Sequence, residues 1–302
     1  MEHKIVDKYR AESIDGFPVK VLKSALQKYA RRQHPDGPAV MALFDASGDS
    51  NPRRKSIRSV AVNRTICMMS EEVGICNPGL PHQLGQLYRQ WIAKRESHVM
   101  MTMYQLVWES PKCRLISDLK TMFYLPPYYS KDQWKYSIQL WDLMQTPANL
   151  RVDSWLDEED LMESISTALQ EGSVSAFAML GAAYRQGRKP YDMWKMVKQL
   201  PMDQDTKNNV CALFFLYIKM THKERYIYLY HAMLLIILRK HHLCNQVDCT
   251  TGARTTGARR KSEDNPTAIT KLEPWVYDMH CGEAKCNEVD FAMEGEIGRA
   301  HV

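Results

Sequence analysis

Apolar residues in the first part of the chain recur with the period of an α-helix. Val19, Leu22, Leu26, Tyr29 and Ala30 recur at the i, i+3, i+4, i+7 spacing, which aligns them along one face of a helix. The segment 34–38, with the sequence His-Pro-Asp-Gly-Pro, contains residues that interrupt helices. The pattern therefore predicts an amphipathic helix that ends before this segment.

Similar apolar stripes continue to about residue 110. They predict helices over residues 38–44, 60–69, 84–92 and 99–108. The helix predicted over residues 60–69 should end near Gly74, because Asn77-Pro78 cannot continue it. Ser110-Pro111 ends the helix predicted over residues 99–108. Helices of this length with short polar connections are typical of an all-α array.

The second half of the chain shows the same periodicity after an aromatic-rich connector. Residues 157–160 are all acidic and are expected in the first turn of a helix, where the helix dipole favours negative charge. Helices are predicted from residue 157 to a break at Gly172 and over residues 173–184, 190–200 and 205–238, the last long enough to be two. No run of strict apolar and polar alternation indicates strands. The apolar run Met233–Leu238 is far shorter than the ~20 residues that cross a bilayer, so it predicts a buried helical turn and no membrane partner.

These patterns predict an all-α protein: a clamp-loader-collar-like helical bundle, a second helical unit and a loop-rich C-terminal tail. The expected parts are an N-terminal extension (1–18), a first helical domain (19–125), an aromatic connector (126–150), a second helical domain (151–245), and a basic linker with an irregular tail (246–302). Residues 297–302 match one reading frame of a sequencing adapter, and our hypothesis is that they are not part of the natural protein.

Composition agrees with an ordinary folded chain. The 302 residues, at roughly 150 per domain, suggest about two domains. The apolar fraction of 45% and charged fraction of 25% exclude wholesale disorder and a disulfide scaffold. The eight cysteines are widely spread and no apolar leader opens the sequence, so we expect an intracellular, reducing compartment such as cytoplasm or nucleus.

Motifs for catalysis are missing from the sequence. It contains no Walker-type phosphate loop, nucleophile elbow or HExxH pair. We therefore expect no enzyme activity, no catalytic residue and no cofactor. The best metal candidate is a set of histidines and cysteines near the C-terminus: His241, His242, Cys244, Cys249, His280, Cys281 and Cys286. Their Cys-x4-Cys spacing fits zinc only marginally, so we expect free thiols and no metal.

A cluster of basic residues is the strongest electrostatic feature. The net charge of +5 is by itself a weak indication of an anionic partner. The cluster flanks successive predicted helices and comprises Arg31, Arg32, Arg53, Arg54, Lys55, Arg58 and Arg64. Phosphate contacts need cations gathered on one surface, so these residues are the candidate DNA-binding set. A solvated helix face or a salt-bridged subunit contact is the alternative interpretation.

Three segments, in order, resemble the C-terminal region of the RarA/MgsA family of clamp-loader-like AAA+ ATPases, which includes the Werner-helicase-interacting proteins. The first is Ser24-Ala25-Leu26-Gln27-Lys28 with Arg31. The second runs from Met69 to Pro78 and carries Ser70, Glu71, Glu72, Gly74 and Pro78. The third is residues 104–113, ending with Pro111, Lys112 and Cys113. The resemblance covers roughly residues 19–120.

The resemblance implies a helical oligomerisation collar and a role at stalled or gapped replication forks. The chain lacks the family's ATPase motifs, and residues from about 121 onward have no clear counterpart, so ATP hydrolysis is not implied. The expected function is a non-catalytic oligomerisation and interaction module of DNA replication or repair, of viral or phage origin. Its expected partners are copies of itself and either DNA or a clamp-loader-like ATPase. The alternatives are a helical structural or assembly protein without a nucleic-acid role and, less favoured, a metal-dependent enzyme that uses Asp278, His280 and the cysteines.

Overall fold

The computed structural model describes residues 13–47, 54–124, 155–156, 159–220, 226–242, 272–273 and 276. Most of these residues are helical, which confirms the predicted all-α class. Contacts divide the chain into two compact units, each assembled from stretches that are separated in the sequence. Unit 1 contains residues 1–65, 93–109 and 254–302, and unit 2 contains residues 66–92 and 110–253. The continuous domain boundaries predicted above stay predictions, and the aromatic connector lies outside the described residues.

Unit 1 begins with a small hairpin. The elements of unit 1 are β1 (Ser13–Ile14), β2 (Phe17–Pro18), α1 (Val19–Arg32), α2 (Gly37–Ala46), most of α3 (Arg54–Met68), and α5 (Ser97–Glu109). The strands pair antiparallel, with Ile14 opposite Phe17. Asp15 and Gly16 form the turn with φ angles of 49° and 84°, as tight hairpin turns require. Strands of two residues are too short to show alternation, which is why the sequence pattern missed them.

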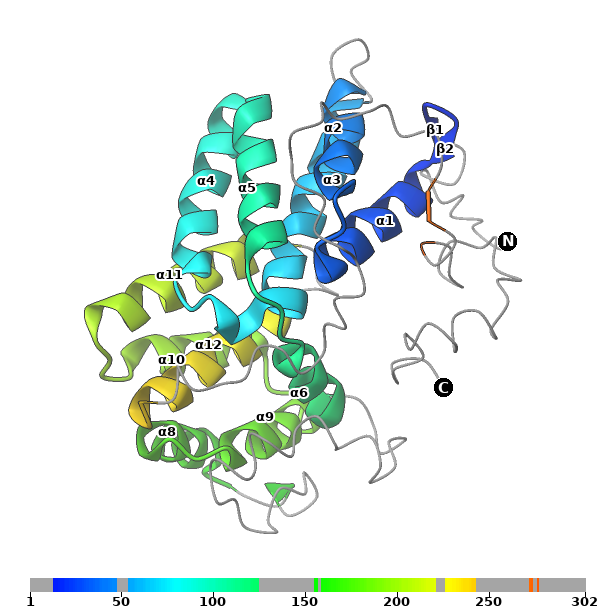
Figure 1. Cartoon of the computed structure of the whole chain (residues 1–302). Helices are drawn as coiled ribbons and strands as arrows, with labels where there is room; N and C mark the ends of the chain where they lie inside the picture. The colour runs from blue at the N-terminus through cyan, green and yellow to red at the C-terminus, as the bar shows by residue number, and fades with distance from the viewer. Residues whose placement is uncertain are drawn as a thin grey trace, which may run out of the picture. The chain divides into compact units, whose positions relative to one another are not determined.

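Helix α1 forms the centre of the unit 1 core. It packs against α2 and α5, and α2 also packs against α5 (Figure 1). Val19, Leu22, Leu26 and Tyr29 are all buried, which confirms the predicted apolar stripe. The helix ends at Arg32, and Gln33 follows it in the left-handed conformation with a φ of 51°. The predicted helix break before residue 38 is therefore confirmed.

Unit 2 is built from the rest of the helices. After the end of α3 come the π-helical turn η1 (Met69–Val73), the 3₁₀ turn η2 (Gly74–Cys76), α4 (Leu80–Lys94), α6 (Leu115–Tyr124), α8 (Leu161–Glu171), α9 (Ser175–Arg185), α10 (Pro190–Gln199), α11 (Gln204–Lys219) and α12 (Tyr226–Lys240). The last two residues of α4 belong to unit 1. The stretch predicted to be one or two helices, 205–238, is thus two helices.

Helix α12 is the central element of unit 2. It packs against α6, α8, α10 and α11 and against both short turns (Figure 1). Every residue from Ile227 to Leu238 is buried, including the predicted buried turn Met233–Leu238. A helix that is apolar all round is stable only when neighbours cover it on all sides. The other helices of unit 2 provide that cover.

Helices α4 and α11 approach each other closely at small residues. A Cβ atom added to Gly85 would lie 3.0 Å from the Cβ atom of Ala212. Nearby, the Oδ1 atom of Asn209 accepts a hydrogen bond from the backbone N–H of His82 at 3.0 Å. The small side chains let the two backbones approach, and the buried amide fixes the crossing.

The start of α8 differs slightly from the prediction. The helix begins at Leu161, with Asp160 before it in a non-helical conformation, so Glu159 and Asp160 precede the first turn instead of forming it. The helix ends, as predicted, at Gly172, which adopts a left-handed φ of 75°. The acidic residues still lie near the positive end of the helix dipole.

Substituting Gly172 tests how tightly α8 is packed at its end. Gly172 and Gly187 have nearly equal φ angles, 75° and 79°, but only Gly172 faces a neighbour: an added Cβ atom would lie 2.4 Å from the Nε2 atom of His241. We expect Gly187→Ala to lower the free energy of unfolding by about 1 kcal/mol through backbone strain alone. Gly172→Ala should lower it by about 3 kcal/mol, because overpacking adds to the strain. Urea unfolding measures both, and equal losses would contradict the packing argument.

Candidate functional site

The predicted DNA-binding arginines that can be described belong to unit 1. Arg31 and Arg32 form the last turn of α1 and are half-buried. Arg64 lies on α3 and is also half-buried. Arg53 lies outside the described residues, as do the side chains of Arg54 and Lys55. The structure therefore shows two neighbouring arginines at one helix end, and the full predicted cluster stays a prediction.

Arg58 has a partner within the fold. Its Nη2 atom lies 2.8 Å from the Oδ1 atom of Asp45 and donates a hydrogen bond to Ser97 Oγ at 3.0 Å. The Arg58 side chain is only 12% exposed. These contacts join α3 to the end of α2 and the start of α5, so Arg58 contributes to the packing of unit 1.

The residues of the first resembling segment hold a distant part of the chain. Ser24 Oγ donates a hydrogen bond to the backbone carbonyl of Val276 at 2.9 Å, and Lys28 Nζ donates to the same oxygen at 3.4 Å. Val276 and Leu272 are buried. Ser24 and Lys28 are one helical turn apart on α1, so both reach one carbonyl.

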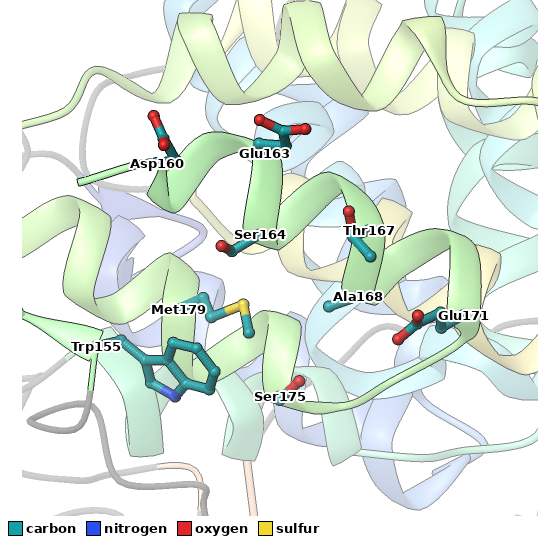
Figure 2. A pocket seen from close by; sticks show the side chains of 9 residues that line it. All are labelled: Trp155, Asp160, Glu163, Ser164, Thr167, Ala168, Glu171, Ser175 and Met179. Carbon is teal, nitrogen blue, oxygen red and sulfur yellow. The ribbon is translucent and has the colours of Figure 1, made fainter. Parts of the chain in front are cut away.

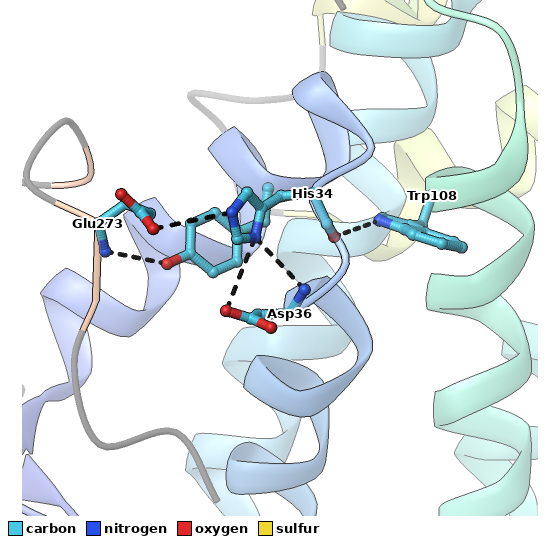
Figure 3. Close-up of polar contacts among 5 residues, drawn as sticks. His34, Asp36, Trp108 and Glu273 are labelled. Atoms are coloured by element: carbon cyan, nitrogen blue, oxygen red, sulfur yellow. Dashed lines mark hydrogen bonds and ion pairs between the residues drawn. The ribbon is translucent and has the colours of Figure 1, made fainter. Parts of the chain in front are cut away.

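His34 extends this contact at the end of α1. Its Nε2 atom lies 3.9 Å from Glu273 Oε1, and its Nδ1 atom accepts a hydrogen bond from the backbone N–H of Asp36 at 3.3 Å (Figure 3). Trp108 Nε1–H donates to the backbone carbonyl of His34 at 2.9 Å. The Tyr29 ring stacks on the imidazole, and its hydroxyl accepts the Glu273 N–H at 3.1 Å. These contacts attach Glu273, like Val276, to α1 and its end.

Residues of the second and third resembling segments contact each other in unit 2. The backbone carbonyl of Glu72, in the π-helical turn η1, accepts the N–H of Cys113 at 2.7 Å. Gly74 has a φ of 53°, and an added Cβ atom would lie 3.2 Å from the Cys113 carbonyl oxygen. Asn77 Nδ2 donates to Ser110 Oγ at 3.0 Å. Gly74 is therefore required both by its backbone conformation and by the close approach of the second chain segment.

The Glu72 carboxylate is fully buried among cations. Its Oε2 atom lies 4.0 Å from Arg114 Nε. Lys112 is also buried, and its ammonium donates to the backbone carbonyl of Ser110. Burial lowers the pKa of Lys112 to about 8, and the negative charge of Glu72 partly opposes that shift. Buried charges need partners in a folded protein, and here the two segments supply them to each other.

A second buried polar pair joins η1 to α12. Ser70 Oγ lies 2.9 Å from His231 Nδ1, and both residues are fully buried. Burial lowers the pKa of His231 to about 3, so the imidazole is neutral at physiological pH. Its Nε2 atom has no hydrogen-bond partner among the described residues. We call Ser70, Glu72, Lys112 and His231, together with the half-buried Arg114, the buried polar cluster.

The buried polar cluster is arranged for stability. A serine beside a histidine resembles a nucleophile and its base, but both side chains are buried, and a nucleophile must be reachable by its substrate. π-Helical turns are rare and frequently mark functional sites. Of the remaining residues of the resembling segments, Glu71 and Pro78 are half-buried and Pro111 is exposed. His231 and Arg114 were not predicted, because nothing in the sequence spacing links them to Glu72.

The C-terminal histidines and cysteines are only partly described. His241 Nε2 lies 2.8 Å from the Gly172 carbonyl oxygen, so this ring contacts the end of α8. Asp278, His280 and the four cysteines of the candidate zinc set lie outside the described residues. Elsewhere, Cys67, Cys113 and Cys211 are free thiols and Cys76 is disulfide-bonded. A reducing compartment does not favour disulfides, so the predicted compartment stays a prediction.

A pocket of about 400 Å³ lies between α8 and α9 in unit 2 (Figure 2). Trp155, Ser164 and Met179 line it, and Asp160, Glu163 and Glu171 add three carboxylates. No basic side chain is among its lining residues. The carboxylates would repel an anionic ligand, so the pocket is not suited to bind the phosphates of a nucleic acid.

None of the helices in the described parts of the chain combines the length and apolarity that spanning a bilayer requires. Comparison of the chain with protein-family models, with curated proteins and with solved structures finds no match.

Proposed function

We propose that the chain is a non-catalytic oligomerisation and interaction module associated with DNA replication or repair, as its resemblance to the RarA/MgsA collar implies. The observation that supports the proposal is the contact between the second and third resembling segments, through Glu72, Gly74 and Cys113. The two segments are about forty positions apart in the sequence, and Glu72 and Lys112, one from each, belong to the buried polar cluster. Segments that resemble one family and form one packed feature are better explained by a common fold than by separate coincidences.

Self-association is the first property that the proposal requires. Light scattering coupled to size exclusion should show a mass that is a multiple of the 35.0 kDa chain and that rises with concentration. A monomer at every concentration up to about 100 μM, well above the dissociation constant of a specific dimer, would contradict the oligomerisation role.

DNA contact is the second property, and Arg31 and Arg32 are its clearest described candidates. We expect the Arg31→Glu/Arg32→Glu variant to weaken binding to a forked DNA by about tenfold or more and to reduce the salt dependence of binding, since each lost phosphate contact reduces counterion release. The matched control is Lys20→Glu/Lys23→Glu, which reverses two charges at the start of the same helix. Fluorescence anisotropy at several salt concentrations measures the binding.

The alternative, a helical structural or assembly protein without a nucleic-acid role, is favoured by the contacts of Arg58. This predicted DNA-binding residue is held by Asp45 and Ser97 instead of facing solvent. Stable self-association together with undetectable DNA binding at low salt would support this alternative against the proposed DNA role.

A further inference from the structure

Unit 2 carries a second surface on which cations lie over aromatic rings. On α11, the Phe214 ring has the Lys198 ammonium of α10 over it, 3.9 Å from the ring centroid. The Tyr191 ring of α10 lies 6.2 Å from the same ring. Trp194 supports Phe214 from the core at 5.4 Å. An aromatic platform bordered by a lysine thus lies between α10 and α11.

The neighbouring residue of α11 repeats this arrangement toward α4. The Arg89 guanidinium of α4 lies over the Phe215 ring, 4.6 Å from its centroid, and the Lys219 ammonium lies 6.0 Å from it. Tyr88 meets the Phe215 ring edge-on at 6.1 Å. The close crossing of α4 and α11 brings Arg89 to this position.

The side chains around Phe214 and those around Phe215 form one surface. Ile218 joins them, because it lies one helical turn after both phenylalanines. Among the described residues, the exposed large apolar side chains are Tyr191 (48%), Ile218 (47%) and Ile92 (37%), on α10, α11 and α4 respectively. We define the cation–aromatic face by six residues: Arg89, Tyr191, Lys198, Phe214, Phe215 and Lys219. Exposed apolar side chains gathered in one place indicate an interaction site more strongly than scattered ones.

The charges of the cation–aromatic face call for an anionic partner. Within the described part of the chain, Arg89, Lys198 and Lys219 form no ion pair with a carboxylate. The neighbouring Lys195, which lies over the Tyr191 ring, does form an ion pair: its Nζ atom lies 3.5 Å from Asp192 Oδ1. The positive charge of the face therefore has no carboxylate partner among the residues that the structure describes.

We propose that the cation–aromatic face binds single-stranded nucleic acid. Proteins that bind single strands combine a basic track for the phosphates with aromatic rings on which bases stack. Here Arg89, Lys198 and Lys219 supply the cations, and the ring available for stacking is the 48% exposed Tyr191, since the phenylalanine rings lie under cations. A duplex keeps its base faces stacked on each other, so it could use only the cations. The proposed site is in unit 2 and shares no residue with the arginines of the proposed function, and it stands independently of that function.

Single-residue variants separate the contribution of phosphate contacts to binding from that of base stacking. Binding of the full chain to a fluorescein-labelled oligothymidylate of about 20 nucleotides is followed by anisotropy over a salt series. Lys198→Gln and Lys219→Gln should each lower the slope of log affinity against log salt by about 0.7, as expected for one lost contact to a single strand. Tyr191→Ala should lower affinity by about tenfold with the slope unchanged, because stacking does not release counterions.

Arg188→Gln is the matched control, since Arg188 is exposed in unit 2 and does not belong to the face. Circular dichroism melts verify that each variant is folded, and Tyr191 is exposed enough that its truncation leaves the core intact. No binding at about 50 mM salt, equal affinity for a duplex of the same length, or face variants that behave like Arg188→Gln would each overturn the proposal. Loss of binding in Arg31→Glu/Arg32→Glu alone would instead assign the contact to unit 1.

Discussion

Replacing Glu72 by glutamine is expected to lower the free energy of unfolding by about 3 kcal/mol at pH 7, because removal of one partner strands the other charge in a buried site. Glu72 is fully buried beside Arg114 and near Lys112. Arg114 is 31% exposed and can turn toward water, whereas Lys112 is 5% exposed and cannot. The main cost therefore comes from the Lys112 ammonium. Chemical denaturation of the variant and the original chain measures the difference.

The dependence of this loss on pH identifies its cause. The pKa of Lys112 is about 8 in the fold and 10.5 as its ordinary value, so the unfolded chain binds more protons between these values and stability rises with pH there. Without Glu72 the pKa of Lys112 in the folded chain falls further, so the rise in the free energy of unfolding begins at a lower pH. The penalty of Glu72→Gln should thus be smaller at pH 9 than at pH 7.

Two further variants serve as controls for the Glu72 prediction. Glu71→Gln changes the adjacent, half-buried carboxylate and should cost within about 0.5 kcal/mol. Lys112→Met combined with Glu72→Gln should recover a large part of the loss, because no charge then remains unpaired. A double variant that is less stable than the sum of the two single losses would contradict the coupling.

Acid is expected to destabilise unit 2 through His231. The pKa of His231 is lowered by burial to about 3, against an ordinary value of 6.5. Above pH 6.5 the His231 imidazole is neutral in both the folded and the unfolded chain, so it does not reduce the free energy of unfolding. As the pH falls from 6.5 toward 3, only the unfolded chain takes up the proton, and stability should fall by up to about 1.4 kcal/mol per pH unit. Unfolding curves at intervals from pH 7 to pH 4.5 measure the slope.

His231→Gln should remove this acid slope, because an amide can still meet Ser70 Oγ but does not titrate in this range. The variant is expected to be less stable at pH 7 and to lose less on acidification. His98→Gln is the control, since the His98 side chain is 75% exposed and its Nε2 atom lies 3.7 Å from Glu96 Oε2 at the surface. The same slope in His231→Gln and in the original chain would show that other groups cause the acid sensitivity.

Local patterns were sufficient to predict the helices other than α6 (Leu115–Tyr124), because each of them buries one stripe or, for α12, its whole surface. The stripe from Val19 to Ala30, the break after Arg32 and the turn at Gly172 all follow from periodicity and from residues that end helices. The hairpin at Asp15-Gly16 was missed, because two residues per strand carry no periodic signal. The start of α8 was placed slightly early, because acidic residues fit both before a helix and in its first turn.

The sites depend on contacts between distant residues. Glu72, Gly74 and Lys112 were chosen by resemblance to a family, but that Glu72 lies beside Arg114, and Ser70 beside His231, follows from the packing of η1 against residues 110–116 and α12. Arg58 shows the reverse case. Its charge made it a candidate for DNA contact, and only the fold shows that Asp45 neutralises it.

The sequence by itself determined the helical class, the helix boundaries to within a few residues and the burial of α12, because these follow from hydrogen bonding and apolar periodicity within one short segment. The tertiary structure decided which charges are buried together, which cations lie over the rings of α11, and that Glu273 and Val276 lie against α1. Such contacts join residues that are far apart along the chain, and the energy of each depends on the burial and charges that the whole fold creates around it.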